Sequence, residues 1–422
     1  MSNLDPNQKR KRQLSLKGVV VTAEGLRKLR AQYLGTREKA DALAVLCLTV
    51  SIFLPFYVTT AVCSVLAVVT MIDYERRQKA FASLYTRVLL GFLLVPFFVA
   101  AMYNNLWGLL VSLILYAVVI CGFYVRSVMT RALFAKALDA ACLCSVGCAA
   151  AALVQKLWML PSAPEYRPVS TFSNANYYGA VVELMLLVCL YRCFTNRPAR
   201  KWYLAAAGAN LLGLYLTASL SSAAAACFGV LVFLALQHRR RLALFVVLAA
   251  GACALLALCF PVLFPRVESI DVAWGQRFSI WKTSLRGILE HPLLGQGAAA
   301  YRIVGPKYGG YITFHSHNLL LDGLLNFGLI GMGVFAFYGF TQARLLRLRF
   351  QNNIGRSVNV LAFSATAAVL AHGVTDVTIF WVQTAMLYLL LISSLSMGAA
   401  FLERELEPQR RAFVPGSLTS AY

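Results

Sequence analysis

The feature that most constrains this chain is a series of apolar stretches, each about 17–25 residues long and bounded by charged or turn residues. A helix of that length matches the hydrocarbon core of a bilayer, which is about 30 Å thick. The chain is 59% hydrophobic, whereas soluble globular proteins contain roughly 45–50% apolar residues. The sequence therefore predicts an all-α, polytopic membrane protein and argues against an ordinary soluble one.

We predict twelve transmembrane helices. The first two come from one apolar run and are divided near Pro55. The predicted spans are 41–56, 57–72, 84–103, 106–125, 137–157, 177–195, 202–218, 220–237, 242–263, 318–342, 357–375 and 380–402. They divide the chain into a basic N-terminal tail (1–40), nine spans (41–263), a large loop (264–317), three spans (318–402) and a C-terminal tail (403–422).

The basic residues indicate an orientation. The net charge is +22, and 31 of the 39 Lys and Arg residues fall in the two tails and in alternate connections. The positive-inside rule assigns that side, with both termini, to the cytoplasm. We therefore interpret the charge as an orientation signal and a contact with anionic membrane lipid, not as nucleic-acid binding. The opposite side carries only Lys156, Arg167, Arg266, Arg277, Lys282, Arg286, Arg302 and Lys307.

The longest connection, 264–317, lies on that opposite, outer side. Its centre, RFSIWKTSLRGILEHP (277–292), places apolar residues on one helical face and ends at a proline, which predicts an interfacial helix over a cavity. Its basic residues outnumber its acidic ones. Two interpretations remain open, namely contact with lipid headgroups and binding of a phosphate or diphosphate by guanidinium groups.

Two of the five histidines, His315 and His317, stand beside Asn318 at the start of the tenth span. They suit a metal site, a pair of interfacial hydrogen-bonding rings, or a general base, because imidazole titrates near neutrality. No Asp, Glu or Cys stands at ligand spacing nearby, so we predict no metal site. Asn318 would orient the ring or a sugar hydroxyl. Asp376, in the outer turn between the last two spans, would tune a basic partner or form a structural salt bridge.

The other long outer connection, 158–176, leads into STFSNANYYGA (170–180). Asn174, Asn176 and Tyr177 offer hydrogen-bonding groups and a stacking surface that suit carbohydrate. Alternatively, Asn and Ser cap the sixth span and the tyrosines join an interfacial aromatic belt.

Together these motifs resemble the O-antigen ligase family, within a wider group of membrane-embedded ligases and polymerases that use polyprenyl-linked sugars. The most specific match is His317-Asn318, nine residues, then Gly328-Leu-Ile-Gly331, which follows the family pattern H-[N/S/Q]-x9-G-x-x-G. RFSIW (277–281), PLLGQG (292–297) and FSNANYYGA (172–180) resemble its other elements, so the likeness spans roughly 165–335. The chain departs from the pattern where many relatives carry Arg after the T-x-S of the turn written here TASLSS, because it has Leu220.

The resemblance implies a glycosyltransferase of lipopolysaccharide biosynthesis in the bacterial inner membrane, with its active site facing the periplasm. The family moves O-antigen polysaccharide from undecaprenyl diphosphate to a sugar of the lipid A–core, so we expect an inverting, metal-independent ligase without a cofactor. His317 would be the general base, while Arg277 and Arg266 would hold the diphosphate, and Arg167, Arg266 or Arg302 would replace the missing arginine. The expected donor- and acceptor-binding residues are Arg302, Arg167, Asn318, His315, Asn174, Asn176, Tyr177, Lys282, Arg286 and Asp376.

Three alternatives remain open. The first is the related O-antigen polymerase, and the second is a protein O-oligosaccharyltransferase. The third, from another class, is a lipid-linked sugar transporter. Transporters are often built from inverted repeats with charges near the membrane midplane. This sequence shows no internal symmetry and gathers its charges at the outer face, which favours the enzymes.

Overall fold

The computed structural model describes residues 14–16, 19–21, 23–264, 266–267 and 269–397. The predicted C-terminal tail (403–422), the end of the last predicted span and the first thirteen residues lie outside these ranges.

The regular secondary structure of the described residues is helical, as predicted, apart from one short antiparallel hairpin of strands β1 (Leu14–Leu16) and β2 (Val19–Val21). The helices are α1 (Ala23–Ser51), α2 (Phe56–Ile72), α3 (Tyr74–Ala80), α4 (Leu84–Phe92), α5 (Val95–Met102), α6 (Leu106–Val128), α7 (Arg131–Met159), α8 (Ala175–Thr195), α9 (Arg200–Thr217), α10 (Leu220–Leu236), α11 (Arg240–Cys259), η1 (Pro261–Leu263), α12 (Ile270–Glu290), α13 (Tyr301–Lys307), α14 (Leu319–Gln351), α15 (Arg356–His372), η2 (Thr378–Phe380), α16 (Val382–Ser393) and η3 (Ser394–Ser396).

Every predicted span overlaps a helix or a pair of consecutive helices. Six spans in the described part of the chain are long and apolar enough to cross a membrane, namely α4 with α5, α6, α7, α8, α11 and α14. The count rises to seven if α2 and α3, which are bent by 103° at the break between them, are taken as one span. The chain is therefore a multi-pass membrane protein, and the number of twelve spans stays a prediction.

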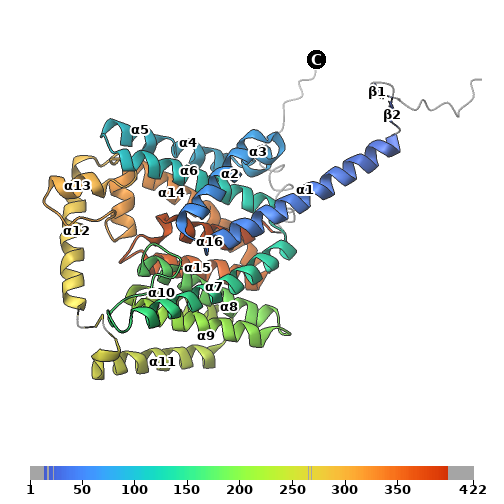
Figure 1. The fold of residues 1–422 in the computed structure, drawn as a ribbon. Helices are drawn as coiled ribbons and strands as arrows, with labels where there is room; N and C mark the ends of the chain where they lie inside the picture. The colour runs from blue at the N-terminus through green and yellow to red at the C-terminus, as the bar shows by residue number, and fades with distance from the viewer. Residues whose placement is uncertain (1–13, 17–18, 22, 265, 268, 398–422) are drawn as a thin grey trace, which may run out of the picture.

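The helices form a bundle in which α8 packs against α7, α9, α10 and α15, while α11 lies at its periphery (Figure 1). In the most apolar window of α8, 83% of the residues are buried, whereas none is buried in that of α11. Helix α12 runs across one end of the bundle, in the region where a helix was expected in loop 264–317, and α1 projects from the opposite end (Figure 1).

Helix α14 is broken at Gly328, where the segment that follows α12 packs against it. Gly328 has a φ of +63°, and a Cβ there would lie 2.3 Å from the backbone of Leu293. The N–H groups of Leu329 and Ile330 donate to the carbonyls of Pro292 and Leu293, at 2.8 and 3.0 Å. Two elements of the family resemblance, PLLGQG and G-x-x-G, are thus joined by main-chain hydrogen bonds.

Candidate active site

Three ionisable side chains from two loops meet at the α12 end of the bundle. His315 and His317 precede α14, and Asp376 follows α15. The Nδ1 atoms of His317 and His315 lie 3.3 and 3.8 Å from Oδ1 of Asp376. We call these three residues the histidine cluster.

Main-chain hydrogen bonds bring the two loops together. The N–H of Leu319 donates to the carbonyl of Gly373 at 2.7 Å, and the side-chain amide of Asn318 donates to the carbonyl of Val374 at 3.0 Å. The Asn318 side-chain oxygen also caps α14 by accepting from the N–H groups of residues 320 and 321. Asn318 is therefore engaged with the backbone here, and its predicted contact with a ring or a sugar stays a prediction.

The backbone at His317 adopts an uncommon conformation, with a φ of +48°. Left-handed backbone at a non-glycine residue costs roughly 1–3 kcal/mol, so the surrounding contacts must hold it. The N–H of Ser316 donates to Oδ1 of Asp322 at 2.7 Å, and the Trp281 indole donates to the His317 carbonyl at 3.4 Å. The histidine loop is thus fixed by both α12 and α14.

Asp376 is buried, with 3% of its side chain exposed. Burial alone would raise the pKa of its carboxyl group, but the adjacent imidazoles of His317, His315 and His372 lower that pKa well below its usual range. Burial also lowers the pKa of His315, only partly opposed by the Asp376 charge. At neutral pH the cluster therefore holds a carboxylate and a neutral His315.

The N-terminal end of α8 completes the cluster. The Tyr177 hydroxyl lies 3.3 Å from Nε2 of His315, and its ring stacks on Trp381 at 4.5 Å. The Asn176 side-chain amide lies 3.4 Å from Oδ2 of Asp376. Asn174 caps α8 by accepting from the N–H of Tyr177, which is the structural alternative foreseen for it.

Two predicted arginines flank the cluster, and each donates to neutral acceptors. Nε of Arg277 donates to the carbonyl of Thr375 at 3.2 Å, directly before Asp376. Nε and Nη2 of Arg167 donate to the carbonyl of Thr217 and to Oδ1 of Asn176, both at 2.7 Å. The guanidinium charges are therefore not neutralised by these contacts.

Arg266 lies close enough to Arg167 and Arg277 to affect both electrostatically. Burial, with a smaller contribution from the Arg266 charge, lowers the pKa of Arg167 to about 10, so Arg167 stays protonated at neutral pH. Burial lowers the pKa of Arg277 as well, the Asp376 charge opposes that change, and Arg266 adds to it. Three cations near one another form a site suited to a multiply charged anion.

Arg167 and Arg266 line a pocket of about 310 Å³, which we call the arginine pocket. Leu220, which occupies the position of the missing family arginine, lines the same pocket. Of the three candidates for replacing that arginine, two therefore share its surroundings. The third, Arg302, lies elsewhere, with its guanidinium 4.8 Å from the Trp107 ring and 4.2 Å from the Phe314 ring.

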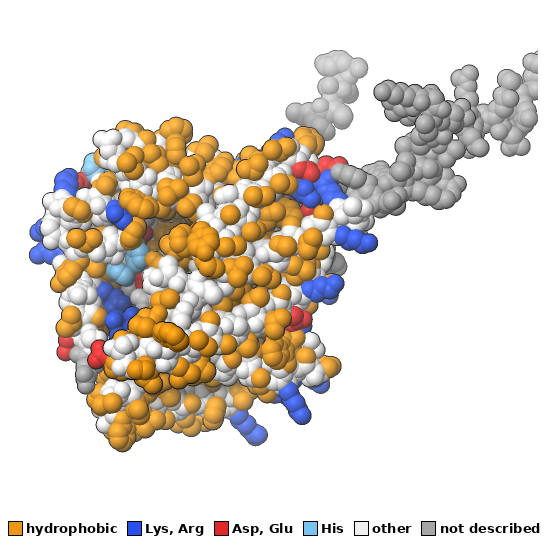
Figure 2. Space-filling model, viewed as in Figure 1, with side chains coloured by type: hydrophobic (Ala, Val, Ile, Leu, Met, Phe, Trp, Pro, Cys, Tyr) orange, Lys and Arg blue, Asp and Glu red, His pale blue; other side chains and the backbone are white. Residues whose placement is uncertain are grey.

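The remaining predicted binding residues are not brought to the cluster. Lys282 and Arg286 are exposed on α12, and the guanidinium of Arg286 lies over the Tyr308 ring. Figure 2 nevertheless shows histidine and basic side chains exposed together in a hollow beside α12. The open face of the site is therefore cationic.

Sequence reasoning missed three residues of this region. Thr313 places its hydroxyl 3.3 Å from Nε2 of His317, and Trp381 supports Tyr177. Glu183, inside α8, pairs with His372 at 2.7 Å, and both are fully buried. The His372 carbonyl accepts the N–H of Asp376 at 3.0 Å, so this pair stands directly behind the cluster. A carboxylate within an apolar span was the one available signal.

The histidine cluster is also the one group of three His, Cys, Asp or Glu residues, among those the structure describes, that could hold a metal ion. One ligand atom from each residue lies within 4.8 Å of the others. Sequence spacing could not indicate this, because Asp376 is far from the histidines along the chain.

Comparison with known proteins adds two findings. Residues 205–336 match the model of a family described as O-Antigen ligase, and this segment includes both histidines of the cluster, Arg266 and Arg277. The chain is also 26% identical over 256 residues to "Exopolysaccharide production protein ExoQ" of Rhizobium meliloti (strain 1021). That similarity covers 53% of this chain and 57% of the relative, so it spans little more than half of either protein.

Proposed function

We propose that this chain, whose residues 205–336 match the model of the O-antigen ligase family, is a membrane-embedded glycosyltransferase of the bacterial inner membrane. It transfers O-antigen polysaccharide from undecaprenyl diphosphate to a hydroxyl of a lipid A–core sugar at the periplasmic face. The observation that carries this proposal is the pairing of His317 with Asp376, 3.3 Å apart and beside unneutralised arginines.

His317 acts as the general base in this proposal. Its side chain is 24% exposed, so an acceptor hydroxyl can reach it. Nε2, which faces the Thr313 hydroxyl, takes the proton. Nδ1–H is held by Oδ1 of Asp376, whose charge stabilises the resulting imidazolium. That contact is not yet aligned as a hydrogen bond, so a small ring rotation completes it, as is common in substrate-free sites.

The arginines stabilise the leaving group. The acceptor oxygen forms a bond to the anomeric carbon as the bond from that carbon to the diphosphate oxygen breaks, and undecaprenyl diphosphate departs with the electron pair. Arg277, Arg266 and Arg167 offset the charge that builds on its phosphate oxygens. Displacement from the opposite face inverts the anomeric configuration. No metal ion is needed, because guanidinium groups supply the positive charge.

Replacement of His317 tests the base. We expect His317→Ala to lower the transfer rate by about 10²–10⁴-fold with little change in the thermal unfolding temperature, measured with purified donor and acceptor in detergent. Half-buried His291, which pairs with Tyr103 away from the cluster, provides a matched control in His291→Ala. A folded His317→Ala protein with wild-type activity would exclude this role.

Chelation tests metal independence. We expect the transfer rate to be unchanged after extended treatment with a strong chelator, because no step uses a metal. Loss of activity that added zinc or magnesium restores would contradict the proposal.

A polymerase is the second candidate, and the similarity to an exopolysaccharide production protein favours it. In that case the acceptor hydroxyl belongs to a second lipid-linked glycan, and the same residues act. Supplying the donor alone, and then with lipid A–core, separates the two. Chain growth without the core acceptor indicates a polymerase, whereas transfer that requires the core indicates a ligase. Transfer in detergent, with no membrane to cross, distinguishes both from a transporter.

A further inference from the structure

We propose that His315, His317 and Asp376 bind a zinc-type divalent ion, and that the bound ion inhibits the enzyme by occupying its general base. The binding is independent of the proposed function, whereas the inhibition rests on it.

Two of the three distances between ligand atoms are close to those that zinc requires. Bonds of about 2.0–2.2 Å in tetrahedral geometry place neighbouring ligand atoms about 3.3–3.6 Å apart. Nδ1 of His317 lies 3.3 Å and Nδ1 of His315 lies 3.8 Å from Oδ1 of Asp376. Nδ1 of His317 is buried and makes no aligned hydrogen bond with any described residue. This nitrogen can therefore act as a ligand in the tautomer that carries the ring proton on Nε2.

The outer atoms of all three ligands already have partners. Nε2 of His317 faces the Thr313 hydroxyl and Nε2 of His315 faces the Tyr177 hydroxyl, each at 3.3 Å. Oδ2 of Asp376 lies 3.4 Å from the Asn176 amide. Metal-binding histidines usually donate their second ring N–H in this way, which fixes the tautomer and the ring orientation.

Two features limit the affinity. Nδ1 of His315 accepts a long hydrogen bond of 3.3 Å from the N–H of His317, which the ion must displace. The charge of Arg277 nearby also opposes a cation. With three ligands and these costs, we expect reversible binding, weaker than in four-ligand structural zinc sites.

The chemistry of imidazole makes occupancy and catalysis mutually exclusive. A neutral ring that binds a metal through Nδ1 carries its proton on Nε2. Nε2 is then a donor to Thr313 and cannot accept a proton from a sugar hydroxyl. The ion also takes the Asp376 oxygen that would stabilise the imidazolium.

Binding is tested on the purified full-length protein in detergent, without donor or acceptor. We expect one Zn²⁺ per chain by calorimetry, and Co²⁺ should give the visible absorption of a tetrahedral site. His315→Gln and Asp376→Asn should each weaken binding about tenfold or more, while His291→Ala should bind normally. Thermal unfolding of each apo variant verifies its fold. A wild-type protein that binds no ion, or folded variants that bind it normally, would overturn the site.

Inhibition is then tested in the transfer assay. Zn²⁺ should inhibit the wild type, a chelator should reverse the effect, and half-inhibition of any residual His315→Gln activity should need at least about tenfold more Zn²⁺. Stimulation by Zn²⁺ would overturn the inhibitory role. Zn²⁺ binding without inhibition would support the metal site but count against His317 as the general base. The metal site and the catalytic proposal can therefore fail separately.

Discussion

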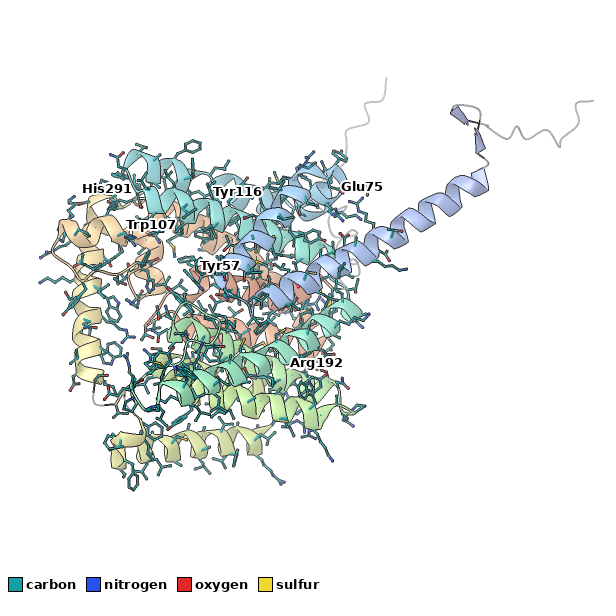
Figure 3. All side chains as sticks on the ribbon, in the orientation of Figure 1. Tyr57, Glu75, Trp107, Tyr116, Arg192 and His291 are labelled. Atoms are coloured by element: carbon teal, nitrogen blue, oxygen red, sulfur yellow. The ribbon has the colours of Figure 1, made fainter. Side chains whose placement is uncertain are left out.

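The arginines at the two ends of the helical bundle have different surroundings. At the end away from α12, some arginines pair with carboxylates, whereas Arg349 and Arg126 donate to amide and carbonyl oxygens. Arg192 lies 2.8 Å from Asp139, and Arg76 lies 2.6 Å from Asp41. Figure 3 shows Glu75 and Arg192 far from Trp107 and His291, which lie toward the candidate site.

At the α12 end the pairing is incomplete. Among the residues that the structure describes, no carboxylate lies within ion-pair distance of Arg167, Arg266, Arg277 or Arg302. Their hydrogen bonds go to carbonyl or amide oxygens, or their guanidinium groups rest on rings. What distinguishes the α12 end is that Arg167 and Arg266, without a described carboxylate partner, line a pocket where their charge is available to a ligand. The difference indicates where an anion binds.

The largest expected effect is on activity, from an arginine of the α12 end. Arg277→Ala should lower the transfer rate by about 10²–10³-fold, as loss of one charge-stabilising donor does elsewhere, with little loss of thermal stability. Arg277→Lys should keep the charge but lose the planar fork, so its transfer rate should lie between those of the wild type and Arg277→Ala. Steady-state transfer assays and thermal unfolding of the same preparations measure the activity and the stability of each variant. A stability loss as large as the activity loss would make Arg277 a structural arginine.

An intermediate effect is expected from the opposite end. Arg192 contacts Asp139 and the Tyr203 hydroxyl. Arg192→Ala should lower the free energy of unfolding by about 2 kcal/mol, because hydrogen bonds to charged groups contribute about 1.5–3 kcal/mol. The transfer rate of the folded fraction should match that of the wild type. Denaturant titration and a rate corrected for folded protein provide the measurements. A specific loss of activity would abolish the distinction between the two ends.

The smallest effect is expected from an exposed ion pair at the α12 end. Lys307 pairs with Glu290 at 2.6 Å, and both side chains are exposed. Lys307→Ala should change the free energy of unfolding very little, because solvent screens exposed ion pairs, and should leave the transfer rate unchanged. This variant sharpens the comparison, because it removes a positive charge from the α12 end without touching the cluster or the pocket. A marked rate loss would extend the anion site to α13.

The helices were predictable because the bilayer sets the length of an apolar run, and every predicted span overlaps a helix. The ends of the helices were less predictable. The tenth span was predicted to end at 342, yet α14 continues to Gln351, because ARLLRLRF is amphipathic and not uniformly apolar. The loop helix begins at Ile270, before the apolar face that indicated it. The prediction of twelve membrane crossings depends on how deep each helix lies in the bilayer, which the residue pattern does not indicate.

The candidate site was predictable in its residue types more than in its contacts. His317 and Asp376 were both chosen from the sequence, but their meeting depends on hydrogen bonds between two loops, such as that from Leu319 to Gly373. Asn174 illustrates the converse, because its position before a helix suited both a cap and a sugar contact, and its oxygen accepts from the Tyr177 N–H. Glu183 was missed because nothing in sequence linked it to His372. The catalytic roles themselves stay predictions.

The break at Gly328 has a mechanical consequence. Helix α12 carries Arg277, and α14 begins immediately after His317, while the backbone that links them is bonded into the gap in α14. The backbone therefore ties the cation to the base through the break in α14. A lipid arriving from the bilayer would thus meet a cation and a base whose relative position the backbone already sets.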